Sequence, residues 1–453
     1  MRENRETPCG PVAPGRMPRR QQTRSGPASS AAQARPRRTP LRLCSAYTGQ
    51  VNPTLADIQS AEAQSLLPTY SRIPLLLERG KGPYVFAADG RRYLDFLTGI
   101  GVNALGYNHP RISRVIRQQS ARLIHCSNLY YHAYQAPLAQ RLAALAGMER
   151  AFFTNSGTEA LEGALKLARL HGRALAADKV EIVALDNSFH GRTFGALSVT
   201  GQPKYRLPYE PALPGVRFVP ANDHAALAAA IGPQTAAVLL EPIQGEGGVV
   251  PLEAAFLTAA AGLARQHQAA LILDEIQCGL GRTGRPFAFQ WTDVVPDIVV
   301  TAKPIACGLP LGVILARGAA ATGFTPGMHG TTFGGGPLVC RVALEFLDIW
   351  EEENLLANVA DRGEELRSGL EALKRKQKPI QVVRGRGLMW GIELDRPAKP
   401  IVDAARELGL LANATHETVI RLLPPYTVTP ALVQKALRLL ARAFRAANRA
   451  AQA

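Results

Sequence analysis

The stretch LILDEIQCGLGRTG, residues 271–284, begins with an apolar run that stops at Asp274. A second apolar run, in DIVVTAK, stops at Lys303, so the carboxylate and the lysine lie 29 residues apart. Both runs are short and bounded by turn residues, which is typical of buried strands. We therefore expect Asp274 and Lys303 at the carboxyl ends of neighbouring strands of one sheet, the edge at which open α/β sheets bind ligands.

A lysine and an aspartate placed in this way suit pyridoxal phosphate chemistry. The lysine binds the C4′ carbon of the cofactor covalently, while the aspartate keeps the pyridine nitrogen protonated. The alternative is that Asp274 caps a turn and that Lys303 is an ordinary surface lysine, the commoner fate of either residue taken alone. The surrounding sequence decides between the two readings.

Other parts of the chain show the same strand pattern. Short apolar runs bounded by turn residues lie at 180–185, 235–240, 270–274, 297–300 and 311–316. Apolar residues at helical spacing, beginning at Leu161, lie between such runs. Strands that alternate with helices predict a mainly parallel sheet that is covered on both faces.

The last third of the chain has a different order of elements. We expect a long helix at about 341–376, a strand-like VRGRGLMWGIEL at 383–394, a helix near 400–412, a strand at VIRLL and a final helix from Ala431. This order suits a separate α+β domain.

The charge of the chain is concentrated at its beginning. The formal net charge is +16, and residues 1–45 hold ten arginines against two glutamates, together with seven prolines. We expect this tail to be disordered. An arginine-rich start can also be an organelle transit peptide, but the prolines exclude a long amphipathic helix, so we prefer a dispensable extension.

The rest of the composition describes an ordinary globular chain. With 453 residues, 47% of them hydrophobic, the chain is long enough for two or three domains, each with a hydrophobic core. No stretch is long and apolar enough to predict a membrane span, and no aromatic residues interleave with the basic ones to predict a nucleic-acid partner. Six cysteines without CxxC or metal-ligand spacing predict a reduced, cytoplasmic protein without a metal site.

Eight blocks of sequence, in one order, resemble the class-III aminotransferases of fold type I. Besides residues 271–284, they are YLDFLTGIGVNALGYNHPRI (93–112), FFTNSGTEALEGALKLAR (152–169), NSFHGRTFGALSVTGQPKY (187–205), LLEPIQGEGGV (239–249), HGTTFGGGPL (329–338), VRGRGLMWGIEL (383–394) and VIRLLPP (419–425). The resemblance runs from about Leu67 to Phe444.

The resemblance implies the architecture of that fold. A large pyridoxal phosphate-binding domain with a mainly parallel, seven-stranded sheet is expected at 106–339. A smaller α+β domain is expected at 340–453, joined by the N-terminal segment 46–105, and the basic tail 1–45 lies outside both.

The block around Ser156 predicts a phosphate site. Ser156 and Glu159 form an S-x-x-E capping box ahead of an amphipathic helix, where amide groups and the helix dipole favour an anion. Alone, this pattern is more often an ordinary helix cap. The resemblance assigns Ser156, Gly157 and Thr158 to the cofactor phosphate. It brings Thr332 to the same phosphate from a neighbouring subunit, which implies a homodimer with shared active sites.

The resemblance also assigns roles around the cofactor ring and the substrate. Phe189 stacks on the pyridine ring and Gln277 lies against the 3-oxygen of the cofactor, although a core phenylalanine and a solvated turn residue are the alternatives. Arg192 binds the α-carboxylate of the donor, for which a planar guanidinium is suited. Thr331 joins the substrate site, and we read His190 as a bystander that shapes the turn.

A carboxylate and an arginine from distant blocks are expected to form a switch. In the resembling enzymes such a glutamate neutralises an arginine while the amine donor is bound, then releases it to bind a carboxylate of 2-oxoglutarate. We assign the two roles to Glu241 and Arg421. A structural ion pair is the alternative.

The resemblance implies amino transfer from a terminal amine to 2-oxoglutarate. The expected donor is N2-acetylornithine, which would give N-acetylglutamate 5-semialdehyde and glutamate in arginine biosynthesis. Ornithine, succinylornithine and carrier-protein-linked lysine or ornithine remain open, because each presents a terminal amine. An aminomutase or decarboxylase of this fold and a non-catalytic binding protein are the rival classes. Pro304 departs from the family pattern and is expected to restrict Lys303 to an extended backbone.

Overall fold

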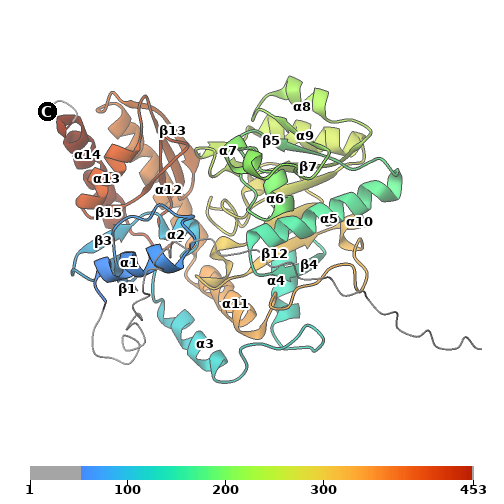
Figure 1. The fold of residues 1–453 in the computed structure, drawn as a ribbon, viewed down its shortest axis with the longest axis horizontal. Helices are drawn as coiled ribbons and strands as arrows, with labels where there is room; N and C mark the ends of the chain where they lie inside the picture. Colours follow the sequence, from blue (N-terminus) through green and yellow to red (C-terminus); the bar gives the residue numbers. More distant parts are fainter. Residues whose placement is uncertain (1–52, 451–453) are drawn as a thin grey trace, which may run out of the picture. The chain divides into compact units, whose positions relative to one another are not determined.

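The computed structural model describes residues 53–450 (Figure 1). They belong to two units. The first unit ends at Pro74 and contains, among the described residues, helix α1 (Leu55–Ser65). The Thr54 side chain caps α1 by accepting a hydrogen bond from the Asp57 amide. The second unit begins at Leu75. The disorder expected for residues 1–45 lies outside the described residues.

The second unit is built around a seven-stranded sheet in the order β4-β12-β11-β10-β7-β5-β6. Its strands are β4 (Arg150–Thr154), β5 (Glu181–Leu185), β6 (Val216–Val219), β7 (Thr235–Leu240), β10 (Ala270–Asp274), β11 (Ile298–Thr301) and β12 (Gly312–Ala316). Only β12 runs against its neighbours. The expected mainly parallel, seven-stranded sheet is therefore confirmed.

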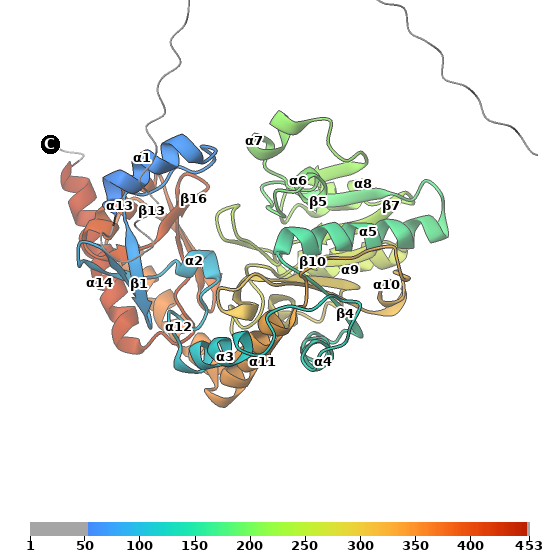
Figure 2. The ribbon, with the colours of Figure 1, turned by 60° about the horizontal axis from the view of Figure 1, so that its bottom comes forward.

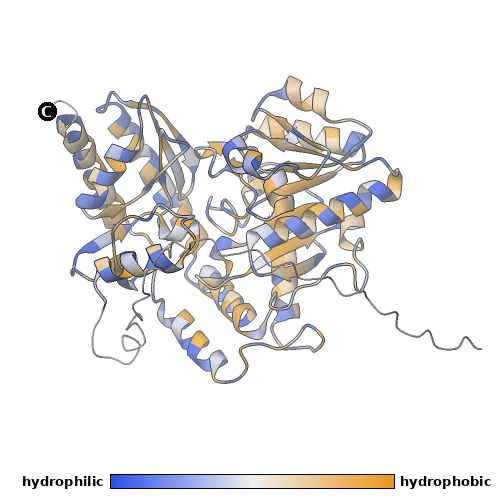
Figure 3. Ribbon diagram, viewed as in Figure 1, coloured by the Kyte–Doolittle hydropathy of each residue, from blue (hydrophilic) through white to orange (hydrophobic). Residues whose placement is uncertain are grey.

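Both faces of this sheet are buried, because alternate residues of each strand enter different cores. In β10, Leu271 and Leu273 belong to one cluster and Ile272 to the other. Helix α5 (Gly157–Leu175) covers the face of Ile272, whereas α4 (Gln135–Ala146) and α9 (Ala254–Gln266) pack on the opposite face. Figure 3 shows the strands as hydrophobic and α5 with hydrophilic residues interspersed.

Short helices and one small hairpin fill the connections. They are α2 (Thr98–Gly101), α3 (Pro110–Ser120), α6 (Phe194–Ser198), α7 (Pro203–Arg206), α8 (His224–Ala230), α10 (Gly318–Ala321), the three-ten helices η2 (Leu207–Tyr209), η3 (Ala288–Trp291) and η4 (Lys303–Ala306), and the strands β8 (Ile243–Gln244) and β9 (Val250–Pro251). Within residues 53–450, no helix combines the length and the apolar character needed to cross a bilayer.

This unit has two further sheets, one of which combines N-terminal with C-terminal strands. One sheet has the order β1-β2-β3-β15 and the other β13-β14-β17-β16. Their strands are β1 (Leu77–Lys81), β2 (Tyr84–Ala87), β3 (Arg92–Asp95), β13 (Ile380–Arg386), β14 (Met389–Leu394), β15 (Leu410–Leu411), β16 (Asn413–Thr415) and β17 (Val419–Leu422). Because β3 pairs with β15, the blue strands lie beside the red elements in Figures 1 and 2. This pairing supports the proposal that the strands β1, β2 and β3 fold with the C-terminal domain.

The C-terminal helices differ from the sequence prediction in one important place. The long helix expected at 341–376 is two helices, α11 (Pro337–Glu352) and α12 (Leu355–Lys374). Asn354 separates them with a φ of 49°, a left-handed conformation that asparagine tolerates better than most residues. The prediction of one continuous helix was therefore wrong.

Two smaller differences involve glycines. The strand-like block 383–394 is a hairpin of β13 and β14, which turns at Gly387 with a φ of 56°. Helix α13 (Lys399–Glu407) ends before 412, and Gly409 has a φ of 88° just ahead of β15. The final helix, α14 (Pro430–Ala450), begins one residue before the expected position.

Candidate active site

A cavity of about 430 Å³ lies at the carboxyl ends of the parallel strands. Its lining comes from the segments that follow β4, β5, β7, β10 and β11. Nine of the residues predicted from sequence line it: Ser156, Gly157, Thr158, Phe189, Arg192, Glu241, Asp274, Gln277 and Lys303. The structure therefore brings the expected catalytic pair, Asp274 and Lys303, and most of the expected cofactor residues to one place.

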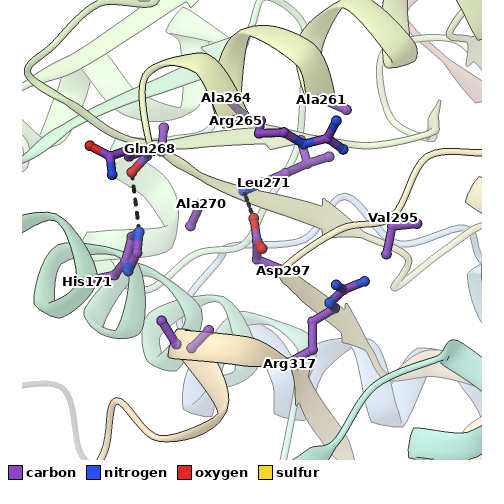
Figure 4. Close-up of a pocket in the computed structure, with 13 residues that line it drawn as sticks. His171, Ala261, Ala264, Arg265, Gln268, Ala270, Leu271, Val295, Asp297 and Arg317 are labelled. Atoms are coloured by element: carbon purple, nitrogen blue, oxygen red, sulfur yellow. Dashed lines mark hydrogen bonds between the residues drawn. The ribbon is translucent and has the colours of Figure 1, made fainter.

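A second cavity, of about 330 Å³, lies at the opposite edge of the same sheet (Figure 4). Leu271 at the start of β10 and Asp297 just before β11 line it, and the Leu271 amide donates to Asp297 Oδ2 at 2.8 Å. On its other side, His171 Nε2 lies 3.2 Å from the Gln268 carbonyl oxygen. None of the predicted site residues lines this cavity.

Asp274 is the last residue of β10 and is buried. Its Oδ1 accepts a hydrogen bond from the Ile276 amide at 3.0 Å, and its Oδ2 lies 2.7 Å from Nδ1 of His190. His190 is therefore more than the bystander that we predicted, because its imidazole holds one oxygen of the expected cofactor aspartate. The contact fixes the orientation of the carboxylate toward the cavity.

Lys303 lies two residues beyond β11 and begins the three-ten helix η4. The expected extended backbone was therefore wrong. Pro304 takes an early position in η4, where its fixed φ is compatible with a helical turn and its missing N–H is not needed. Burial lowers the pKa of the Lys303 amine to about 8, although the Glu246 carboxylate nearby opposes the shift. This amine therefore loses its proton more readily than that of an ordinary exposed lysine.

The amino end of α5 forms one wall of the cavity. Ser156 caps the helix by accepting from the Glu159 amide at 3.3 Å. The predicted capping box is only half formed, because the Glu159 carboxylate accepts from the Asn155 amide at 2.7 Å instead of from Ser156. The Thr158 hydroxyl accepts from the amides of Arg192 and Thr193. Amides, hydroxyls and the positive helix end therefore meet where an anion would bind.

Phe189 and Arg192 lie on the loop after β5. The Phe189 ring packs edge-on against Tyr205, with centroids 6.0 Å apart. The exposed Arg192 places its guanidinium carbon 3.9 Å from the centroid of the Tyr205 ring. This stacking on Tyr205 holds the Arg192 guanidinium at the mouth of the cavity without a contact to a carboxylate of the described residues.

Arg421 forms its ion pair with Glu246, not with Glu241. Its Nη1 lies 2.5 Å from Glu246 Oε1 and 3.1 Å from Gln277 Oε1, while Nε donates to Asn413 Oδ1 at 3.1 Å. Asn413 faces Arg421 across the β16–β17 pair. The Arg421 side chain is fully buried, and its Nη2 has no hydrogen-bond partner among the described residues.

Glu241 has a different environment from the one predicted. Its carboxylate accepts from the amides of Phe189 at 2.9 Å and Gly245 at 3.0 Å, so both oxygens are engaged by the backbone. Burial raises its pKa to about 7. The pairing of Glu241 with Arg421 was therefore a wrong prediction, because the loop after β7 directs Glu246 to the arginine.

Thr331 and Thr332 do not line the cavity. The Thr331 hydroxyl accepts from Asn155 Nδ2 at 3.2 Å, and Asn155 does line it. Thr332 is exposed. Its expected role belongs to a neighbouring subunit and stays a prediction.

Sequence reasoning passed over two residues of this site, His190 and Glu246. His190 follows Phe189 in the block 187–205, but it lies 84 positions before Asp274 in the chain. Glu246 lies five residues after Glu241 in the same block, so either glutamate was available to pair with Arg421. Only the fold distinguishes between the two glutamates.

Comparison with protein-family models and known proteins gives one consistent result. The model described as Aminotransferase class-III matches residues 66–444. Acetylornithine aminotransferase 1 of Bordetella bronchiseptica is 46% identical over 380 residues, which cover 83% of this chain and 97% of the relative. The acetylornithine aminotransferase of Methanothermobacter thermautotrophicus is 42% identical over 384 residues, covering 85% of this chain and 97% of the relative.

Solved structures show the same similarity. The ornithine aminotransferase of Toxoplasma gondii ME49 superposes with a TM-score of 0.84 at 31% identity, covering 89% of this chain and 98% of that chain. The N-acetylornithine aminotransferase of Stenotrophomonas maltophilia K279a gives a TM-score of 0.75 at 35% identity, covering 86% and 99%.

Proposed function

Because this chain belongs to the class-III aminotransferases, a family of pyridoxal phosphate-dependent enzymes, we propose that it transfers the terminal amino group of N2-acetylornithine to 2-oxoglutarate. The products are N-acetylglutamate 5-semialdehyde and glutamate, and the reaction belongs to arginine biosynthesis. The donor is inferred from the relatives, which are named acetylornithine aminotransferases at 46% and 42% identity.

The observation that supports this proposal most directly is the composition of one cavity. Lys303, Asp274 and the amino end of α5 all line it, and Gln277, a further lining residue, contacts the buried Arg421. A lysine for covalent attachment, an aspartate for the ring nitrogen and a helix end for the phosphate are the groups that pyridoxal phosphate needs.

The residues present fit this cofactor. A side chain at Gly157 would place its Cβ 2.6 Å from the Ile276 side chain, and one at Gly191 would collide with the Thr158 hydroxyl. Both glycines therefore keep the backbone close around the space at the helix end. Ser156, Gly157 and Thr158 would hold the phosphate, Phe189 the face of the ring, Asp274 its nitrogen and Gln277 its 3-oxygen.

Pyridoxal phosphate, when bound, supplies an electron sink for the bond that breaks at the substrate carbon. The side chains of this chain do the remaining work. The Lys303 amine, with its lowered pKa, accepts a proton from the substrate carbon and returns it. Asp274, held by His190 and the Ile276 amide, keeps a negative charge beside the ring nitrogen.

Two arginines at different depths suit two differently shaped substrates. A terminal-amine donor carries no carboxylate on its reacting carbon, whereas 2-oxoglutarate carries one there and a second at its far end. We assign the near carboxylate to Arg421, which lies next to the lysine site. Arg192 at the mouth binds the far carboxylate of 2-oxoglutarate and, in the other half-reaction, the α-carboxylate of the donor. Glu246 neutralises Arg421 while the donor is bound, the part that the sequence had suggested for Glu241.

A homodimer with shared sites is part of the proposal. Leu129, Tyr130 and Tyr131 are exposed, and the adjacent Asn128 side chain donates to the carbonyls of Thr331 and Gly334. Phe333 is also exposed. These neighbouring apolar side chains form a surface that suits a second copy of the chain, from which Thr332 would reach the phosphate and Thr331 the substrate.

The experiment is an assay of the purified holoenzyme with 2-oxoglutarate and a panel of terminal amines: N2-acetylornithine, ornithine, succinylornithine and lysine. Glutamate should form fastest with N2-acetylornithine. A faster reaction with another amine would replace the donor and keep the reaction class. Consumption of an amine without glutamate formation would point to a mutase or decarboxylase and overturn the proposal.

A further inference from the structure

Arg282 is a fully buried arginine in the loop that follows β10. No aspartate or glutamate in the described part of the chain forms an ion pair with it. Its Nη1 instead donates to two backbone oxygens, those of Leu388 at 3.2 Å and Pro424 at 2.5 Å. A buried charge without a carboxylate is uncommon, so its contacts need an explanation.

The two carbonyls belong to facing ends of neighbouring strands. In the β14–β17 pair, Gly391 lies opposite Arg421 and Trp390 lies opposite Leu422. Continued two residues beyond Trp390 and Leu422, the same register places Leu388 opposite Pro424. Pro424 has no N–H with which to continue the ladder. The guanidinium of Arg282 provides a donor at this point and joins the two strand ends.

The same loop also contacts the side chain of Arg421. Gln277, five residues before Arg282, accepts from Arg421 Nη1 at 3.1 Å. Pro424, held by Arg282, lies three residues after Arg421 on the chain. One loop of the large domain, which begins at Asp274, therefore fixes both the side chain of Arg421 and the strand that carries it.

The side chain of Arg282 also contacts Tyr426 of the C-terminal domain. Its guanidinium carbon lies 4.5 Å from the centroid of the Tyr426 ring, and Tyr426 is itself fully buried. The backbone contact is reciprocal, because the Leu388 amide donates to the Arg282 carbonyl at 2.9 Å. Burial lowers the pKa of Arg282, but a guanidinium stays protonated at any physiological pH, so its two hydrogen bonds remain charge-assisted.

We propose that Arg282 is a positioning residue for the dicarboxylic substrate: it holds the end of β17 against the loop after β10 and so sets the distance between Arg421 and the catalytic pair. This inference rests on the proposed role of Arg421 in binding 2-oxoglutarate. Without the bridge, the strand end shifts, and the carboxylate on the reacting carbon is held in the wrong place. A terminal-amine donor, which does not use Arg421, is affected much less.

The test compares Arg282→Met, which keeps the length of the side chain but cannot donate, with Arg282→Lys, whose ammonium can still bridge the two carbonyls. Arg169→Met is the matched control, because the Arg169 guanidinium also donates to a backbone oxygen, that of Pro214 at 2.7 Å, and lies on α5 instead. Single-turnover rates of the two half-reactions are measured on each holoenzyme. Glutarate binding is measured by calorimetry.

For Arg282→Met we expect the concentration of 2-oxoglutarate that gives half-maximal rate to rise at least tenfold, with glutarate binding weakened in parallel. The donor concentration for half-maximal rate should change less than twofold. The 2-oxoglutarate concentration that Arg282→Lys needs for half-maximal rate should lie between the values for Arg282→Met and for the unmodified enzyme. The value for Arg169→Met should equal that of the unmodified enzyme. If Arg282→Met does not fold, Arg282→Lys alone must show the selective rise.

Equal losses in both half-reactions, or no change in either, would overturn the positioning role. The unmodified enzyme, measured alongside, separates this failure from a failure of the proposed function. If the unmodified enzyme does not transfer an amino group to 2-oxoglutarate, the proposed function fails. If it does and the Arg282 variants are not selective, only the present inference fails.

Discussion

His190 and Asp274 form a buried pair, with Nδ1 of the imidazole 2.7 Å from Oδ2 of the carboxylate. His190 lies on the loop that follows β5, whereas Asp274 is the last residue of β10. The imidazole and the Ile276 amide together engage both oxygens of the carboxylate. The orientation of the expected cofactor aspartate therefore depends on a residue from a different strand connection.

His190→Phe should lower turnover by roughly 10- to 100-fold, because a hydrogen bond to a charged group contributes about 1.5–3 kcal/mol and about 1.4 kcal/mol corresponds to a factor of ten. It should also change the pH dependence of the bound cofactor's absorbance, which a general loss of packing would not do. The control is His171→Phe, which removes an imidazole that bonds a backbone oxygen in the second cavity. Similar losses in both variants would contradict the positioning role.

Lys303→Ala should abolish nearly all turnover, because it removes both the attachment point and the base. Borohydride reduction of the unmodified holoenzyme, followed by peptide mapping, should label Lys303. Lys179→Met is the control, since Lys179 is also buried but donates to the carbonyls of Pro233 and His267. A label on any other lysine would refute the assignment.

Arg421→Ala should chiefly impair the half-reaction with 2-oxoglutarate, at a loss of about 1.5–3 kcal/mol for one charge-assisted contact. Glu246→Ala should leave Arg421 without its ion-pair partner. It should therefore raise the rate with glutamate as donor relative to the rate with N2-acetylornithine. Single-turnover rates with each substrate measure both effects.

Glu241→Gln is the control variant for Glu246→Ala, because the Glu241 carboxylate accepts hydrogen bonds from backbone amides and does not contact Arg421. It should leave the preference between glutamate and N2-acetylornithine unchanged. A shift of preference in Glu241→Gln but not in Glu246→Ala would show that the ion pair in the structure is not the functional one.

Glu275 should make stability depend on pH. It is fully buried, and burial raises its pKa from 4.5 to about 7, although the amides of Ala288 and Phe289 donate to it. The folded protein therefore retains a proton that the unfolded chain loses, so stability falls as pH rises from about 4.5 to about 7.

In the Glu275→Gln variant, this loss should be smaller by up to roughly 3 kcal/mol. Melting temperatures of the two proteins, measured at intervals from pH 4.5 to 8, give the comparison. Glu241 titrates in the same sense and remains in the variant, so the slope should decrease without vanishing. Parallel pH profiles for the two proteins would contradict the prediction.

Local patterns in the sequence predicted the sheet and the shared location of Asp274 and Lys303 well. The runs at 235–240 and 270–274 coincide with β7 and β10, because apolar residues bounded by turns specify short buried strands. The break at Asn354 was missed, since one asparagine inside a long helical pattern gives little local signal. The partners of Asp274 and Arg421 were missed for another reason: both contacts join segments far apart in the chain, and only packing brings them together.

The pairing of β10 with β11 places Asp274 opposite Val300. The connection between the two strands supplies Ile276 and Gln277 to the cavity and Arg282 to the ends of β14 and β17, so its first part is fixed by these contacts. Insertions or deletions are therefore tolerable in evolution only beyond Trp291, the last residue of η3, provided that the hydrogen-bonded alignment of the strands is kept. A slip of one residue, by contrast, would move Lys303 by about 3.3 Å along the sheet and exchange the faces of Val299 and Val300. Natural variation should therefore accumulate in the last part of the connection and spare both the alignment and the contacting residues before it.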